Sequence, residues 1–326
     1  MLRAATALLL AIVAGAWSPI PRIVMAAEPT RLPDFDAEWD FDHPDSTEAR
    51  FRSILPAARR AGDPDYLVQL LTQVARAEGL QMKFDDAART LDEAESLLTD
   101  KWPDGRVRVL LERGRLLNSS NRREASKRYF LEAWEFSNTR VVPDVYRVDV
   151  AHMLGIVESG DSSVSWNRTA IAIAETSADP KARRWLGSLY NNLGWTYHDK
   201  GEYATALDLF QKALRAREES GKKSDIRVAR WCVARAMRSL GRLDEALAMQ
   251  EALLAEGKAE QAPDGYVEEE IGECLLGLGR PAEATPHFAA AHALLSADPW
   301  LQRDEAERLE RLRRLGGVPE PAPKKP

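Results

Sequence analysis

The stretch that decides the fold covers residues 187–220 and reads GSLYNNLGWTYHDKGEYATALDLFQKALRAREES. It places a large residue beside a small one at Leu193-Gly194 and a glycine at Gly201, and it continues with Ala206, Phe210 and Ala213. Two antiparallel helices approach closely where small residues face each other and larger residues fill the gaps beside them. The stretch therefore predicts two closely packed helices that are joined by a turn at Gly201.

The same arrangement recurs on both sides of this unit, although the copies are weaker. Six repeats are counted, beginning near Val68, Val107, Asp144, Gly187, Arg227 and Gly265. They follow one another at roughly 37 to 43 residues, a period typical of stacked helical repeats. Ala, Leu, Arg and Glu dominate the chain, which favours helix throughout. The sequence predicts an all-α fold.

The unit resembles the tetratricopeptide repeat, and the block RRWLGSLYNNLGWTYHDKGEYATALDLFQKAL, residues 183–214, is specific to that family. The pair Asn191-Asn192 resembles the longer repeats of the kinesin-light-chain type. Gln250 stands where an aromatic residue is usual, and Ser126 where alanine is usual, so the repeats that contain them depart from the family pattern at these positions. The resemblance implies a right-handed α-solenoid of about six helix pairs over residues 46–315.

Both ends of the repeat region have the pattern of capping helices. Residues 46–60 form one amphipathic segment with Ser46 as a candidate N-cap, and they are expected to close the first repeat as a half-repeat. Residues 301–315 form a highly charged helix, and a polar outer face is what a terminal repeat needs. Residues 316–326 begin with Gly316-Gly317 and end in a proline-rich tail, which is expected to be disordered.

The first 26 residues have the pattern of a secretory signal peptide. A positive start at Arg3 is followed by an apolar run and by small residues, with a cut expected after Ala26 or Ala27. The mature protein is expected to be periplasmic or secreted in a bacterium, without membrane insertion after cleavage. The alternative is an inner-membrane anchor formed by an uncleaved signal. Removal of residues 1–26 takes Arg3 and Arg22 away and changes the net charge from −6 to −8.

Residues 27–45 form an arm in which acidic and aromatic residues alternate. Residues 34–42 read DFDAEWDFD, and this period of two predicts an extended segment with its apolar groups on one face. One interpretation is an arm that packs on the first repeat. The other is a mimic of the true ligand, which lies in or near an arginine-lined groove and is displaced by a partner.

The family resemblance implies that ligands lie on the concave face, which is built from the first helix of each pair. Placing the repeats in register puts Arg76 on that face together with the candidate ligand-binding residues Arg115, Asn118, His152, Asn191, Trp195, His198, Trp231, Arg235 and Arg238. Arginine donates paired hydrogen bonds to carboxylates, and asparagine can bridge a peptide backbone. The predicted partner is a protein or peptide that is acidic or has a free C-terminal carboxylate, held at a groove centred on repeats four and five.

Other functions have less support in the sequence. The five histidines are scattered without metal-ligand spacing, nucleotide-binding and hydrolase motifs are absent, and no catalytic residue, metal or cofactor is expected. The triplet Glu268-Glu269-Glu270 is expected to be solvated helix surface. A chain of net charge −6 without a basic stripe is a poor nucleic-acid binder. Two alternatives remain, namely a small-molecule or envelope-glycan binder that uses Trp195 and Trp231, and an accessory subunit that uses the convex face.

The chain has two cysteines, Cys232 and Cys274, so one disulfide at most can form. Two small buried residues on neighbouring helices are the simpler interpretation, and a disulfide in an oxidising compartment is the alternative.

Overall fold

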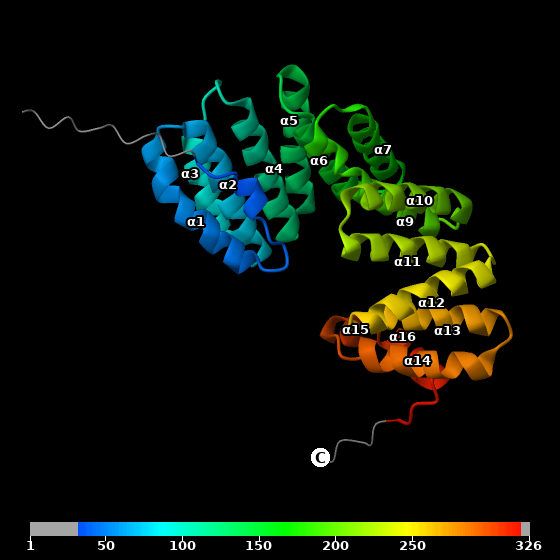
Figure 1. Cartoon of the computed structure of the whole chain (residues 1–326). Coiled ribbons are helices and arrows are strands. Elements are labelled where there is room, and N and C mark those ends of the chain that lie inside the picture. Colours follow the sequence, from blue (N-terminus) through cyan, green and yellow to red (C-terminus); the bar gives the residue numbers. More distant parts are fainter. Residues whose placement is uncertain (1–31, 321–326) are drawn as a thin grey trace, which may run out of the picture.

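The computed structural model describes residues 32–320, and the predicted signal peptide lies outside the described residues. The described chain is helical and forms an α-solenoid of six helix pairs (Figure 1). The pairs are α2 (Pro64–Leu80) with α3 (Phe84–Ser96), α4 (Pro103–Ser119) with α5 (Arg123–Thr139), α6 (Asp144–Val157) with α7 (Gly160–Thr176), α9 (Leu186–Asp199) with α10 (Tyr203–Ser220), α11 (Lys223–Ser239) with α12 (Leu243–Ala259), and α13 (Gly265–Gly277) with α14 (Pro281–Leu295). The six predicted repeats are confirmed in number and order.

Each helix pair turns at one residue with a left-handed backbone. These residues are Met82, Asn121, Gly160, Gly201, Gly241 and Gly279, with φ angles between 57° and 78°. In five pairs this residue follows the first helix, where a left-handed backbone satisfies the last carbonyls and ends the helix sharply, whereas Gly160 is the first residue of α7. Glycine adopts this conformation without a steric cost. Several helices begin with a proline in the first turn, and Asp63 and Asp264 cap α2 and α13 through their side chains.

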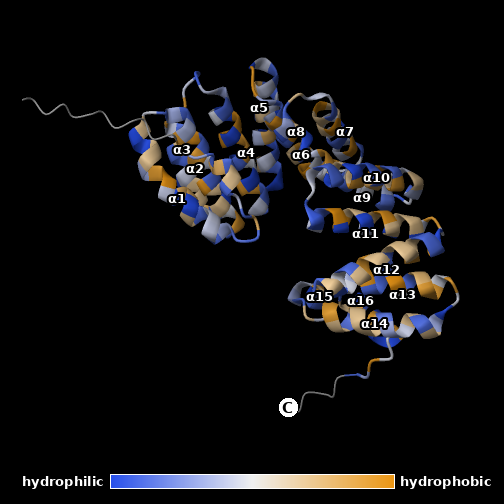
Figure 2. Ribbon diagram, viewed as in Figure 1, coloured by the Kyte–Doolittle hydropathy of each residue, from blue (hydrophilic) through white to orange (hydrophobic). Residues whose placement is uncertain are grey.

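Within the pairs, a glycine of the first helix faces a phenylalanine of the second. A Cβ atom added to Gly194 would lie 2.6 Å from the ring of Phe210, so the ring packs directly against the backbone of Gly194. Gly114 faces Phe130 and Gly272 faces Phe288 in the same way. The phenylalanines are fully buried, and the long apolar cluster extends from Val148 on α6 to Leu312 near the C-terminus. Figure 2 shows that hydrophobic and hydrophilic residues alternate along the helices, as expected for helices with one face in a core.

The ends differ from the prediction in detail. The first capping helix, α1 (Pro44–Ala61), begins two residues before Ser46, because Pro44 supplies a first-turn residue that needs no hydrogen-bond partner. The C-terminal helix is broken at Glu305 into α15 (Pro299–Asp304) and α16 (Ala306–Leu315). A short helix, α8 (Pro180–Arg183), is inserted between repeats three and four. No helix within residues 32–320 has the length and apolar character needed to cross a membrane.

The arm is not extended throughout. Residues Phe35–Glu38 form a 3-10 turn, η1, because the Asp34 side chain accepts a hydrogen bond from the backbone N–H of Asp36 and starts a helical turn. The alternation of acidic and aromatic residues therefore does not place all apolar groups on one face. Phe35 is buried, whereas Phe41 is 58% exposed.

Candidate functional site

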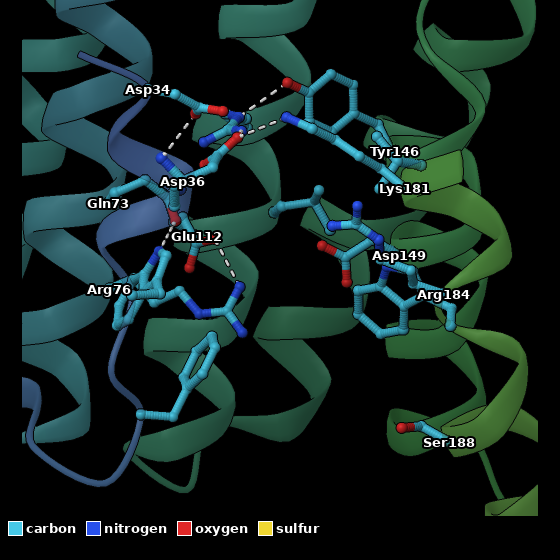
Figure 3. A pocket seen from close by; sticks show the side chains of 17 residues that line it. Asp34, Asp36, Gln73, Arg76, Glu112, Tyr146, Asp149, Lys181, Arg184 and Ser188 are labelled. Atoms are coloured by element: carbon cyan, nitrogen blue, oxygen red, sulfur yellow. Dashed lines mark hydrogen bonds and ion pairs between the residues drawn. The ribbon is translucent and has the colours of Figure 1, made fainter. Parts of the chain in front are cut away.

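A hollow of about 560 Å³ lies on the concave side of the first three repeats. Its walls come from α2, α4, α6 and α8, and from the start of α9. The side chains are predominantly charged and aromatic (Figure 3). The residues that bear on its chemistry are Gln73, Arg76, Arg108, Glu112, Tyr146, Asp149, Lys181, Arg184, Trp185 and Ser188.

The N-terminal arm forms one wall of this hollow. The carboxylate of Asp36 lies 2.7 Å from a guanidinium nitrogen of Arg108 on α4 and 3.4 Å from the ammonium nitrogen of Lys181 on α8. The indole N–H of Trp39 donates a 3.0 Å hydrogen bond to the side-chain oxygen of Gln73 on α2. The arm therefore crosses the concave face from the first repeat to the segment that follows the third.

The aromatic residues of the arm lie beneath a second arginine. The rings of Trp39 and Phe41 are stacked with centroids 4.6 Å apart. The guanidinium carbon of Arg76 is 5.7 Å from the Trp39 ring and 5.4 Å from the Phe41 ring, within the range of cation–π attraction. The nearest carboxylate oxygen to Arg76 belongs to Glu112, at 3.5 Å.

Arg108 is the best-satisfied cation of the hollow. Burial alone would lower its pKa, but the hydroxyl of Tyr146 and the carboxylate of Asp36 raise the pKa above the usual value for arginine. Burial would raise the pKa of Asp36, and the neighbouring Arg108 and Lys181 hold it below its ordinary value. Both groups therefore stay charged at neutral pH, and the contact between them is a partly buried ion pair.

A second hollow of about 390 Å³ shares Arg76, Glu112, Trp185 and Ser188 with the first. It brings together three of the predicted ligand-binding residues, Arg115, Asn118 and His152. Arg115 is already engaged by Glu112 and by Asp149, so its guanidinium is not left for an external carboxylate.

His152 lies at the wall of the second hollow with its ring 5.2 Å from that of Trp185. Burial lowers the pKa of His152, and the positive charges of Arg115 and Arg76 act in the same direction while Asp149 opposes them. The imidazole is neutral at pH 7. Its Nδ1 atom and one carboxylate oxygen of Glu112 are buried without a hydrogen-bond partner in the protein.

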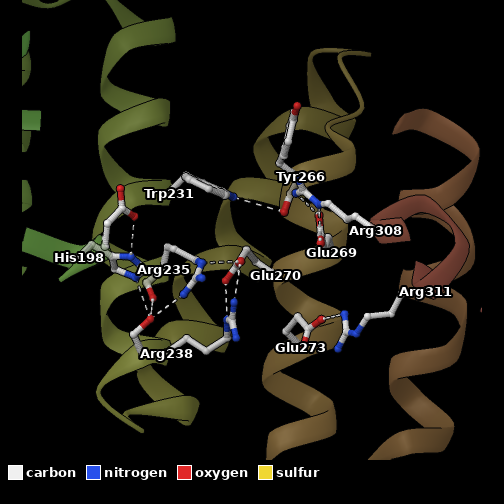
Figure 4. Close-up of polar contacts among 12 residues, drawn as sticks. His198, Trp231, Arg235, Arg238, Tyr266, Glu269, Glu270, Glu273, Arg308 and Arg311 are labelled. Atoms are coloured by element: carbon white, nitrogen blue, oxygen red, sulfur yellow. Dashed lines mark hydrogen bonds and ion pairs between the residues drawn. The ribbon is translucent and has the colours of Figure 1, made fainter. Parts of the chain in front are cut away.

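The other predicted residues form a second polar group on repeats four to six (Figure 4). Arg235 and Arg238 share the buried carboxylate of Glu270 at 3.1 and 2.7 Å. His198 is within 2.9 Å of the Ser239 hydroxyl, which also accepts a hydrogen bond from Arg235 at 2.6 Å. The guanidinium groups of Arg235 and Arg238 therefore already interact with a carboxylate and a hydroxyl of the protein itself.

Trp195, Trp231 and Asn191 of this region also make contacts within the protein. The rings of Trp195 and Trp231 lie 6.0 Å apart, and the indole N–H of Trp231 donates to the backbone oxygen of Tyr266. The side-chain oxygen of Asn191 is 3.3 Å from the sulfur of Cys232. The structure thus brings Asn191, Trp195 and Trp231 together between α9 and α11, where they contribute to helix packing.

The expectation that Glu268-Glu269-Glu270 is solvated surface was wrong. All three residues are buried, and each carboxylate has a cationic or imidazole partner from another helix. Glu268 accepts from His287, Glu269 from Arg308 on α16, and Glu270 from the arginines of α11. Glu269 and Glu270 thus connect the last repeat to α16 on one side and to α11 on the other.

Cys232 and Cys274 are buried and are not joined by a disulfide. Burial raises the pKa of Cys232 to about 11 and that of Cys274 to about 12, so both are neutral thiols at pH 7. Within residues 32–320 no group of three or more His, Cys, Asp and Glu is placed to hold a metal ion.

Sequence reasoning missed the cations that the arm contacts, Arg108 and Lys181. Arg108, Glu112 and Arg115 follow one another at four and three residues, which places them on one helix face, so a charged stripe on α4 was visible in the sequence. Lys181 could not be found in this way, because the insertion of α8 falls outside the repeat pattern.

Comparison with known proteins supports the repeat assignment. Residues 145–219 match the tetratricopeptide repeat family model. A signal transduction ATPase with numerous domains from Pyrococcus horikoshii, which has a tetratricopeptide repeat sensor, superposes with a TM-score of 0.63 at 13% identity. That match covers 85% of this chain and 44% of the other, so this chain spans less than half the length of that protein.

Two further solved structures are less similar. A putative kinesin light chain with nearly identical repeats from Podosopora anserina has a TM-score of 0.48 at 15% identity, over 59% of this chain and 96% of its own. MamA from AMB-1 has a TM-score of 0.41 at 23% identity, over 60% and 94%. No curated protein matches the chain closely enough to count as a relative. Residues 145–219 thus carry the tetratricopeptide repeat match, and the six helix pairs form an α-solenoid similar in fold to solved tetratricopeptide-repeat structures.

Proposed function

We propose that this protein is a non-catalytic scaffold of the bacterial envelope, and that it binds a peptide segment of a partner protein in the concave hollow of repeats one to three. The observation that carries the proposal is the arm itself. An acidic and aromatic segment of the chain already lies against this surface through Asp36 and Trp39. A surface that binds one such segment in cis has the chemistry to bind another.

The charge of the hollow supports an acidic ligand. Arg76, Arg108, Lys181 and Arg184 all line it, against the carboxylates of Glu112 and Asp149 and those of the arm. Guanidinium groups match carboxylates in geometry and keep their charge when buried. Tyr146 and Trp185 add apolar walls with polar tips. This groove differs from the predicted one, whose arginines on α11 have carboxylate partners within the protein.

Site-specific photocrosslinking tests the proposal. A benzophenone amino acid replaces Ser188, which is exposed beside the hollow, or Glu135, which is exposed on α5, the second helix of repeat two. In the native host we expect one partner protein to be crosslinked from Ser188 and not from Glu135. Equal labelling from both positions would place the interface outside the groove. Failure of Ser188 to label any polypeptide would contradict peptide binding there.

The envelope location is proposed from the predicted signal peptide. Mass spectrometry of the protein from a periplasmic fraction should find a mature chain that begins at Ala27 or Glu28. Recovery in the cytoplasm with the first 26 residues intact would exclude export, and recovery with the membrane with the same residues intact would favour the uncleaved anchor.

A small-molecule or glycan ligand is the second candidate function. It is favoured by a hollow of about 380 Å³ between α11 and α13, which Val228, Trp231, Tyr266 and Val267 line with mainly apolar groups. Aromatic faces of this kind stack on sugar rings or planar ligands. Retention of the purified protein on immobilised envelope glycan, lost in Trp231→Ala, would favour this candidate over the peptide groove.

A further inference from the structure

The arm contacts the groove mainly through side chains that another segment could supply. The backbone groups of the arm form hydrogen bonds within the arm or with residues of α1 and α2. The Ala37 N–H donates to the Asp34 carbonyl oxygen, and the Tyr66 hydroxyl donates to the Pro33 carbonyl oxygen. Across α4 and α8 its contacts are the carboxylate of Asp36 and the ring of Phe35, which lies 5.4 Å from the guanidinium of Arg108. The attachment beyond the second helix therefore depends on a few side chains at one edge of the hollow.

These contacts satisfy groups that would otherwise be costly to bury. Arg108 is 8% exposed, and Asp36 is the carboxylate that neutralises it. A buried guanidinium without a counter-charge is strongly destabilising. When the arm leaves, another carboxylate has to take the place of Asp36. The groove therefore selects an acidic residue at this point.

A second requirement follows from Arg76. Its guanidinium faces the rings of Trp39 and Phe41, and beyond these its carboxylate contact is the 3.5 Å approach to Glu112. Trp39 also donates to Gln73. A segment that replaces the arm has to offer Arg76 an aromatic face, and an indole would also keep the bond to Gln73. Asp36 and Trp39 are three residues apart, which fixes the spacing of the two anchors.

We infer that the arm is a displaceable intramolecular ligand, and that the partner binds through an acidic residue followed three positions later by a large aromatic residue. This inference rests on the proposed function and specifies its ligand. The partner segment replaces residues 34–41, including the ring of Phe35 that is buried in the first core cluster, and continues past the exposed Phe41 toward Trp185 and Ser188 at the wall of the hollow. Free protein is thus held in a closed state, and partner binding includes the cost of releasing the arm.

The test uses the full chain and a labelled peptide with the sequence of residues 33–43, PDFDAEWDFDH. Fluorescence anisotropy measures its affinity for the wild type, for Asp36→Asn, and for Asp42→Asn. Asp42 is an exposed acid of the same arm with no ion pair among the described residues, so it is the matched control. We expect Asp36→Asn to bind the peptide at least roughly tenfold more tightly than the wild type and the control, since its own arm no longer neutralises Arg108.

Two further measurements make the result decisive. A peptide with asparagine in place of its second aspartate should lose the preference for Asp36→Asn. Hydrogen exchange should show faster exchange at residues 34–41 in Asp36→Asn than in the wild type, with α4 and α6 unchanged. If Asp36→Asn does not fold, Trp39→Ala replaces it, and the same increase in peptide affinity is expected.

Equal peptide affinity for the wild type and for Asp36→Asn, or for Trp39→Ala where it replaces Asp36→Asn, would overturn the inference. It would show that the arm is a fixed structural element. The outcome is separable from the proposed function, because a partner crosslinked at Ser188 would then still establish groove binding by a segment of different chemistry. If Asp36→Asn does not bind the peptide more tightly and no partner is crosslinked from Ser188, the inference and the proposed function are both overturned.

Discussion

At the scale of single residues, the contact between Gly194 and Phe210 sets the distance between two helices. A methyl group at Gly194 would meet the Phe210 ring at 2.6 Å, so we expect Gly194→Ala to destabilise the fold by roughly 1–3 kcal/mol through overpacking. Gly79 on α2 is the matched control, because a Cβ atom there meets nothing within 4 Å. Gly79→Ala should raise stability by roughly 0.5–1 kcal/mol. Thermal unfolding of both variants checks the two signs, and destabilisation by both would contradict the packing argument.

Gln250 occupies the position that phenylalanine holds in repeats two, four and six. It is fully buried on α12, and both its side-chain oxygen and nitrogen have no hydrogen-bond partner in the protein. An unsatisfied buried amide costs roughly 1–3 kcal/mol. Methionine has a similar shape without that amide, so Gln250→Met should raise the unfolding midpoint.

The same substitution at Gln81 provides the control for Gln250. The Gln81 amide donates to Glu48 at 2.9 Å and to the backbone oxygen of Ala77 at 3.0 Å. Gln81→Met removes these bonds and should lower the midpoint in chemical denaturation. Equal effects of the two methionine variants would show that the Gln250 amide is satisfied in solution.

At the scale of the helix pair, the turn in repeat one places a non-glycine residue in a left-handed backbone conformation. Met82 has φ 59°, and its side chain is 76% exposed. The left-handed conformation costs a residue with a Cβ atom roughly 1–2 kcal/mol, whereas glycine adopts it freely. Met82→Gly therefore gives up little burial and should stabilise repeat one by roughly 1 kcal/mol. Hydrogen exchange in α2 and α3 measures this effect, and unchanged or faster exchange would contradict it.

The helices and turns were predictable because their signals are local. The small residue at Gly194, the turn at Gly201 and the aromatic at Phe210 lie within one repeat, and each acts through sterics that do not depend on the rest of the chain. The turn at Met82 was less clear, since methionine carries no preference for a left-handed backbone. The break at Glu305 was missed because Leu301, before it, and Leu309, after it, are eight residues apart, a spacing that a continuous helix would also show.

The partners of the groove residues were not predictable, because they come from neighbouring repeats. Glu270 lies more than thirty residues after Arg235 and Arg238, and its carboxylate forms ion pairs with both of them. A single helix face predicts exposed arginines, while the stacked helices turn them into internal ion pairs. The arm's route past Arg108 depended in addition on the 3-10 turn at Phe35 and on the inserted α8.

At the scale of the whole molecule, stability is distributed from repeat to repeat. Each helix pair packs on its neighbours, and the apolar core is divided between a long cluster that ends at Leu312 and smaller clusters in the first repeats. In such an array each repeat depends on its intrinsic stability and on the contacts with the adjacent repeats. A defect at one end should therefore loosen that end and leave the other end unchanged.

The C-terminal cap gives a direct test of this locality. Leu312 on α16 is fully buried against repeat six, so Leu312→Ala should cost roughly 2–5 kcal/mol where the cap meets α14. Hydrogen exchange followed by mass spectrometry should show faster exchange in α13, α14 and α16, with α2 to α5 unchanged. Leu276→Ala on α13, where 37% of the side chain is exposed, is the control and should have a smaller effect. Equal loss of protection in α2 to α5 would mean that the solenoid unfolds as one cooperative unit. In that case the clusters near the arm would respond to changes at the cap, and arm release and cap stability would have to be measured together.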